Sequence, residues 1–62
     1  MPEHWWDIAY CDYLIMVDDV LDDNGHESST EEEMAMIAEC QEADESPEVC
    51  AEGIVKLREE ES

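Results

Sequence analysis

Lysine and arginine are almost absent from this sequence. Its 62 residues contain only two of them, against twenty aspartates and glutamates, and the formal net charge at pH 7 is −18. Small soluble domains usually carry a net charge of about 2–8 units. Since a strongly anionic surface repels phosphate groups and anionic lipids, we expect no direct binding to nucleic acid or to a membrane. The charge favours a basic protein as the partner.

Signals for export and membrane insertion are also missing. The first residues, MPEHWWD, have neither the basic region nor the small-residue cleavage site of a secretory signal. The longest apolar run in the first predicted helix, from Tyr13 to Val17, is too short to span a bilayer. We therefore expect a cytoplasmic protein.

The three cysteines do not form a recognisable disulfide or zinc pattern. Cys11, Cys40 and Cys50 are odd in number and lack C-x-x-C spacing. Their places on apolar helix faces are typical of small buried hydrophobic residues. Unpaired cysteines also fit a reducing compartment.

Motifs for calcium binding and catalysis are incomplete or missing. The segment around Gly25 has the spacing of an EF-hand loop, with Glu31 at the twelfth position, but Val20 at the first position cannot bind calcium. No defensible Ser/His/Asp or Cys/His arrangement and no glycine-rich phosphate loop is present. We predict a protein that is not an enzyme and that has no metal and no cofactor.

One segment, HWWDIAYCDYLIMVDDVLDD from His4 to Asp23, holds both tryptophans, both tyrosines and six of the seven aspartates. Its apolar residues recur with helical spacing, which predicts an amphipathic helix over about residues 4–22. We expect Trp6 in the core and Trp5 at its edge. The predicted core face comprises Trp6, Ala9, Tyr10, Tyr13, Leu14, Val17, Val20 and Leu21. The opposite arc comprises Asp7, Asp12, Asp18, Asp19, Asp22 and Asp23.

Two further helices are predicted, over residues 30–44 and 47–60. Gly25 is suited to the left-handed geometry just past the first helix. Ser29 with Glu32, or Thr30 with Glu33, has the spacing of a capping box at the second helix. Ser46 and Pro47 suit the N-cap and first position of the third helix. The prediction is an all-α fold of three helices, with residues 1–62 forming a single small acidic domain.

The placement of the acidic residues points to binding. Asp18, Asp19, Asp22 and Asp23 crowd the C-terminal part of the first helix, where the helix dipole disfavours each by about 0.3–1 kcal/mol. A sequence selected for stability alone would not put them there. The acidic stretch continues through the linker and the next helix start with Glu27, Glu31, Glu32 and Glu33. Both basic residues, Lys56 and Arg58, fall on the third helix as expected internal neutralisers.

Apolar residues interrupt the acidic arc of the first helix. Ile8, Cys11 and Ile15 lie at i, i+3 and i+7 among the aspartates. They have two interpretations: packing beneath another helix, or forming an apolar strip with a charged rim, as at a protein interface. Trp5 is the better tryptophan for an external contact, and a homodimer through the first helix is one such contact.

In length, charge and helical pattern the chain resembles the small acidic inhibitors of phages and mobile elements, which mimic DNA to block restriction, CRISPR or recombination machinery. Duplex DNA as long as a compact domain of this size, roughly 27 Å, carries about 16 phosphates. The resemblance implies a non-enzymatic inhibitor that occupies the DNA- or RNA-binding groove of a basic protein, in the cytoplasm of a host cell.

Under that hypothesis the partner-binding residues fall into two groups. The mimicking charge would come from Asp7, Asp12, Asp18, Asp19, Asp22, Asp23, Glu27, Glu31, Glu32 and Glu33. Specificity would come from the apolar residues Trp5, Ile8 and Ile15, because charge mainly steers and accelerates association. Two alternatives remain: an acidic dimeric adaptor or assembly module that binds a basic peptide or helix, and a salt-adapted domain whose acids maintain hydration.

Overall fold

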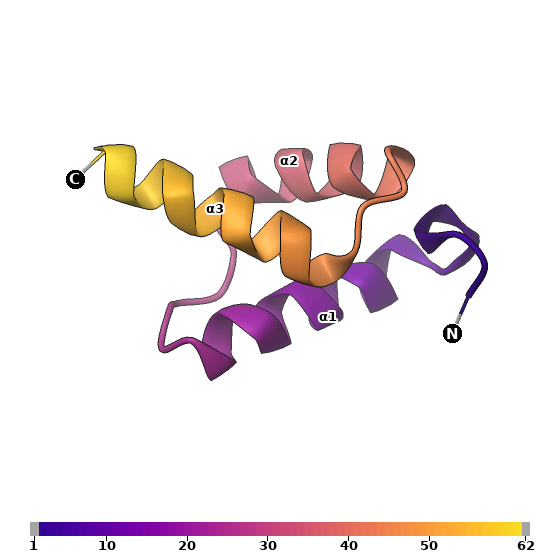
Figure 1. Cartoon of the computed structure of the whole chain (residues 1–62), viewed down its shortest axis with the longest axis horizontal. Helices are drawn as coiled ribbons and strands as arrows, with labels where there is room; N and C mark the ends of the chain where they lie inside the picture. The colour runs from indigo at the N-terminus through magenta and orange to yellow at the C-terminus, as the bar shows by residue number, and fades with distance from the viewer. Residues whose placement is uncertain (1, 62) are drawn as a thin grey trace.

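The computed structural model describes residues 2–61, which form three α-helices after a short 3₁₀ turn (Figure 1). The order is η1 (Trp5–Asp7), α1 (Tyr10–Asp23), α2 (Glu31–Glu42) and α3 (Pro47–Glu61). The radius of gyration is 10.9 Å and the principal axes measure 35 × 20 × 17 Å. The predicted all-α, three-helix fold is confirmed, although the body is more elongated than the compact 27 Å shape expected from its length. No helix within residues 2–61 is long and apolar enough to cross a bilayer.

The end of α1 is set by Gly25, as predicted. Gly25 has a φ of +77°, which costs glycine little because it has no Cβ. Its N–H donates to the carbonyl of Asp22 over 2.9 Å, and the N–H of His26 donates to the carbonyl of Leu21 over 2.8 Å. This pair of bonds is a Schellman motif, which satisfies carbonyls that the helix leaves free.

The starts of α2 and α3 also follow from short-range chemistry. Thr30 is the residue that caps α2: its Oγ1 accepts from the N–H of Glu33, and its own N–H donates to Glu33 Oε1 over 2.9 Å. Of the two capping boxes compatible with the sequence, the structure therefore uses Thr30 with Glu33. At α3, Ser46 Oγ accepts from the N–H of Val49 over 3.4 Å, and Pro47 occupies the first helical position.

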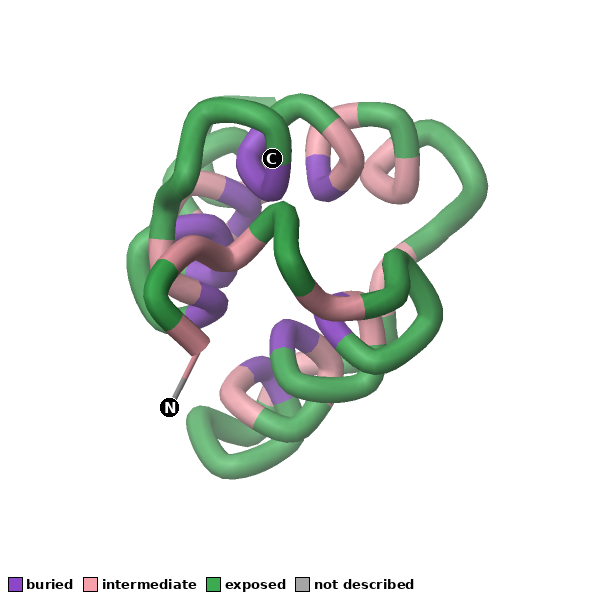
Figure 2. The backbone as a smooth tube through the Cα atoms, turned by 90° about the vertical axis from the view of Figure 1, so that its right-hand side faces the viewer, coloured by how far each residue is buried: buried purple, intermediate pink, exposed green. Residues whose placement is uncertain are grey.

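The core lies between the three helices. Figure 2 shows the buried parts of the backbone facing the interior of the bundle and the exposed parts facing outward. Cys40 and Cys50 are buried as the small hydrophobic residues that the sequence suggested, whereas Cys11 is exposed. The buried apolar side chains are Tyr13, Val17 and Leu21 from α1, Ile37 and Cys40 from α2, and Cys50, Ala51 and Ile54 from α3.

The prediction of a continuous first helix from His4 is wrong. Trp5–Asp7 form a 3₁₀ turn, Ile8 and Ala9 are extended, and α1 begins at Tyr10. The side chain of Gln41 stabilises the break, since its Nε2 donates to the carbonyls of Trp5 and Ile8 over 3.1 and 2.9 Å. Those carbonyls are thereby bonded to α2 instead of continuing a helix.

The break exchanges the expected roles of the two tryptophans. Trp5 is half-buried and meets Tyr13 edge-on, with 6.2 Å between ring centroids. Trp6, predicted to lie in the core, is 51% exposed and stacks on His4 at 4.5 Å. Tyr10 is also exposed, and its hydroxyl donates to the carbonyl of Met34 over 2.9 Å. The helical phase that placed Trp6 in the core is lost at the extended residues before α1.

Candidate partner-binding surface

The outer face of α1 carries exposed acids around one exposed isoleucine. Asp12 and Asp19 are exposed and lie three residues before and four residues after Ile15, which is 58% exposed. Residues at these spacings are neighbours on a helix surface, with Cβ atoms about 5–6 Å apart. Tyr13 and Val17 point the opposite way and are fully buried. Ile15 therefore fits the second of the two interpretations, an exposed apolar residue with a charged rim.

The apolar residues that the sequence placed in or beside the acidic arc differ in their exposure. Ile8 is half-buried against the core, so it follows the packing interpretation. Trp5 also packs against the core, although part of it remains at the surface. Cys11 and Ile15 are exposed on α1. The structure does not bring Trp5, Ile8 and Ile15 together into a single apolar strip.

Eight exposed acids lie together at one end of the molecule. α1 and α3 run in the same direction, so their C-termini lie at the end where the 24–30 linker and the start of α2 also lie (Figure 1, left). Arg58 joins these parts, because its Nη1 donates to the carbonyl of Glu27 and its Nη2 to the carbonyl of Ser28, each over 3.1 Å. We call this region the acidic end; its exposed acids are Asp22, Asp23, Glu27, Glu31, Glu32, Glu59, Glu60 and Glu61.

Three acids of this end were missed in the sequence prediction. Glu59, Glu60 and Glu61 are not among the predicted binding residues, and they form the end of α3, directly after Arg58. Hydrophobic periodicity indicates which face of a helix is buried but not toward which neighbour its end points. The available signal was Arg58, the single arginine of the sequence, which directly precedes this acidic run.

Two predicted binding residues are engaged within the protein. Asp18 Oδ1 accepts from the N–H and the hydroxyl of Ser29, over 3.0 and 2.8 Å. Glu33 accepts from Arg58 in a bidentate pair, with distances of 2.7 and 2.8 Å. The Arg58 guanidinium is the main reason that the pKa of Glu33 lies below its ordinary value. These two carboxylates fix the linker and the α2–α3 contact.

The remaining acids of the prediction are exposed, but they do not form one patch. Asp7 belongs to η1, at the opposite end from the linker (Figure 1). Arg58 acts as the expected internal neutraliser, whereas Lys56 makes no ion pair within residues 2–61. The acids left exposed are Asp7, Asp12, Asp19, Asp22, Asp23, Glu27, Glu31 and Glu32.

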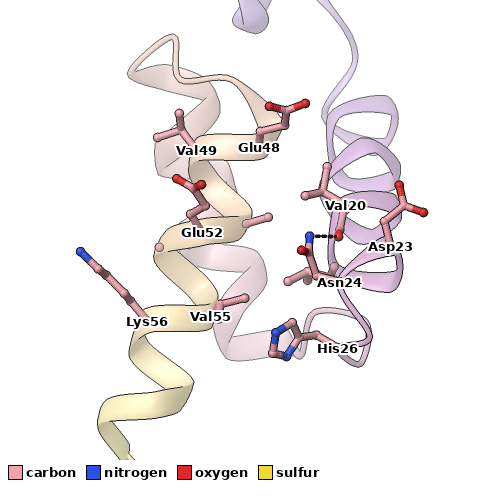
Figure 3. A pocket seen from close by; sticks show the side chains of 12 residues that line it. Val20, Asp23, Asn24, His26, Glu48, Val49, Glu52, Val55 and Lys56 are labelled. Carbon is pink, nitrogen blue, oxygen red and sulfur yellow. Dashed lines mark hydrogen bonds between the residues drawn. The ribbon is translucent and has the colours of Figure 1, made fainter.

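Between α1 and α3 lies an open groove. It has a volume of about 860 Å³, and its lining includes Val20 and Asp23 from α1 and Val49 and Glu52 from α3. In Figure 3, Val20 and Val55 point into the gap between the two helices. A smaller hollow of about 300 Å³ shares Val20 with it and continues toward Trp5. The two hollows together follow the seam between the two helices.

The buried polar groups serve packing. Burial is the main cause that raises the pKa of the Cys40 and Cys50 thiols, which keeps them protonated and poor nucleophiles. The hydroxyl of Tyr13 donates to the carbonyl of Glu45 over 2.7 Å. Within residues 2–61 no three His, Cys, Asp or Glu side chains are arranged to hold a metal ion. What the surface offers is therefore charge, one exposed isoleucine and a groove.

Comparison with known proteins adds no relative. No family model matches the chain, and neither the curated proteins nor the solved structures contain a match.

Proposed function

We propose that this protein is a non-enzymatic inhibitor that binds a basic nucleic-acid-binding protein in place of DNA or RNA. The observation that carries the proposal is charge density. A net charge of −18 is spread over a body 35 Å long. Duplex DNA carries one charge per ~1.7 Å of axis, hence about 20 over the same length. Arg58, one of the two basic residues, is already paired with Glu33.

The spacing of the acids supports the same function. Successive turns of α1 are about 5.4 Å apart, whereas phosphates along one DNA strand rise by about 3.4 Å each. Lysine and arginine side chains are long and flexible enough to reach either spacing. A groove lined with them could therefore accept the exposed carboxylates of α1 and of the acidic end. Ile15 would supply an apolar contact within that array and thereby part of the specificity.

The proposal is tested by competition with nucleic acid. Basic proteins captured from a host would be mixed with labelled duplex DNA or RNA and titrated with this protein while fluorescence anisotropy is followed. Mimicry requires that the two ligands exclude each other and that affinity falls as salt rises. A ternary complex of target, nucleic acid and this protein would refute mimicry and favour the acidic adaptor. A fold that forms only in molar salt would favour the salt-adapted domain instead.

A matched pair of variants shows whether location matters beyond total charge. The triple variant Asp19→Asn, Asp22→Asn, Asp23→Asn and the control Glu39→Gln, Glu42→Gln, Glu45→Gln each remove three exposed carboxylates. We expect the α1 triple to weaken target binding at least tenfold more than the control. The same variant should melt at a higher temperature, because its acids lie at the unfavourable end of the helix dipole. Weaker binding could then not be attributed to unfolding, and equal effects of the two triples would reject the α1 surface.

A further inference from the structure

The groove between α1 and α3 is long enough to hold a segment of another protein. Its two hollows have volumes of about 860 and 300 Å³ and share Val20 and Glu48. Along α1 the lining runs from Met16 to Asp23, eight residues whose ends are about 10 Å apart along the helix axis. Two turns of helix therefore fit along the seam.

The groove is lined with apolar side chains that the chain itself leaves uncovered. Val49 on α3 is 49% exposed and Met16 on α1 is 39% exposed. Val20 and Val55 are half-buried and face the groove from the two walls (Figure 3). Trp5 contributes the end of the smaller hollow. Apolar groups gathered in a concave surface gain free energy when another apolar group displaces the water.

The rim of the groove is anionic. Asp23, Glu48 and Glu52 line the groove beside the apolar side chains, and its basic groups are Lys56 and His26. A second copy of this chain would bring another −18 charges against this rim. Charge complementarity therefore selects a cationic occupant.

We propose that this groove binds an amphipathic α-helix of the target protein, with an apolar stripe flanked by lysines or arginines. Helices pack into grooves between helices by placing side chains at i, i+3, i+4 and i+7 among those of the walls. An extended peptide gains its affinity from a free strand edge, and residues 2–61 contain no strand. The inference rests on the proposed function, because the helix is assigned to the same basic target. It gives that target a second, apolar contact that nucleic acid does not make.

Direct titration with synthetic peptides tests the groove without the target. The probe is a 14-residue peptide with leucines at helical spacing and lysines on both flanks. One control has the same composition in a scrambled order, and another carries a central proline that breaks the helix. Binding is followed by backbone amide shifts of the protein in NMR. We expect the amphipathic peptide to bind at least tenfold more tightly than either control and to shift signals at Val20, Val49 and Val55.

The variant Val49→Glu separates apolar docking from simple charge attraction. It adds a carboxylate to an acidic groove, so attraction alone predicts equal or tighter binding of the basic peptide. Loss of the apolar contact predicts binding weakened at least tenfold. The third helical position favours glutamate after an N-cap serine, so α3 should fold normally. Leu57→Glu is the control: it puts the same charge on the same helix at a site that is 45% exposed and outside the groove lining.

The other outcomes overturn the proposal in recognisable ways. Equal binding of the scrambled peptide, or unchanged binding by Val49→Glu, would reduce the effect to charge and reject the groove. A dimer in sedimentation equilibrium that Val49→Glu dissociates would make a second copy the occupant. If any of these results is found while the protein still competes with nucleic acid for the target, only this inference fails and the proposed function stands. Peptide binding without any competition for the target would instead retain the groove and reject the proposed function.

Discussion

Arg58 offers the sharpest test of how this acidic fold is held together. Its guanidinium donates two hydrogen bonds to the Glu33 carboxylate and one each to the carbonyls of Glu27 and Ser28. The Arg58 and Glu33 side chains are 25% and 17% exposed. Arg58→Gln would remove these hydrogen bonds and make the net charge more negative by one unit. Lys56→Gln makes the same change of charge at an exposed residue without an ion pair in the described chain.

The expected loss can be bounded from known cases. Exposed ion pairs contribute about 0–1 kcal/mol, while breaking a fully buried pair costs about 3–5 kcal/mol. The partial burial of this pair places Arg58→Gln between those limits, at about 2 kcal/mol of unfolding free energy. In a domain of this size each kcal/mol shifts the melting temperature by about 4–8 °C. We therefore expect Arg58→Gln to melt about 8–16 °C lower than the native chain, with a much smaller change for Lys56→Gln.

Circular dichroism melts at several pH values complete the test. The pKa of Glu33 is lowered in the folded state, so the contribution of the pair is present above the ordinary value of 4.5. It is lost as the pH falls through the lowered pKa. The gap between the two variants should therefore persist at neutral pH in moderate salt and narrow in acid. Equal melting temperatures at neutral pH would show that Arg58 acts only through net charge and would refute the reasoning.

Other predictions concern the turns and the N-terminal segment. Gly25→Ala should destabilise by about 1–2 kcal/mol, because φ is +77° there. Gly53→Ala should stabilise the fold by up to about 1 kcal/mol, since the added Cβ would meet only the flexible end of the Met36 side chain at 3.1 Å. Urea unfolding midpoints that shift in the same direction for Gly25→Ala and Gly53→Ala would contradict these two predictions. The hydrogen bond of 2.8 Å between His4 and Asp44 is the main cause that raises the pKa of His4 and lowers that of Asp44. The stability gap between the native chain and His4→Gln should therefore shrink as pH rises from 6.5 through the raised pKa, and also as pH falls from 3.8 through the lowered one. A pH-independent gap would contradict it.

Helix ends were predictable where a few neighbouring residues decide them. Gly25 ends α1, Thr30 with Glu33 starts α2, and Ser46 caps α3, each through partners within a few positions. The start of α1 was not predictable in this way. The segment before it is held by Gln41, whose bonds to Trp5 and Ile8 cross 36 and 33 residues. A periodic pattern carries no information about such a partner.

The candidate site was predictable as a composition but not as a surface. The sequence predicts an acidic outer face on α1, and Asp12, Asp19, Asp22 and Asp23 are exposed there. It does not show that Asp18 is committed to Ser29, or that Glu33 is committed to Arg58 across 25 residues. The groove was missed for a similar reason, because Val20 and Val49 look like ordinary core residues until the packing of α1 against α3 leaves them at its edge.

The crowding of aspartates at the C-terminal part of α1 links folding to binding. Mutual repulsion and the helix dipole raise the free energy of the folded protein when it is alone. A basic ligand that binds only the folded form lowers it again, so stability rises with the concentration of that ligand. Under the proposed function, copies without a target unfold more often than bound copies. A protease that cleaves the unfolded chain would then remove the idle copies first and leave those engaged with the target.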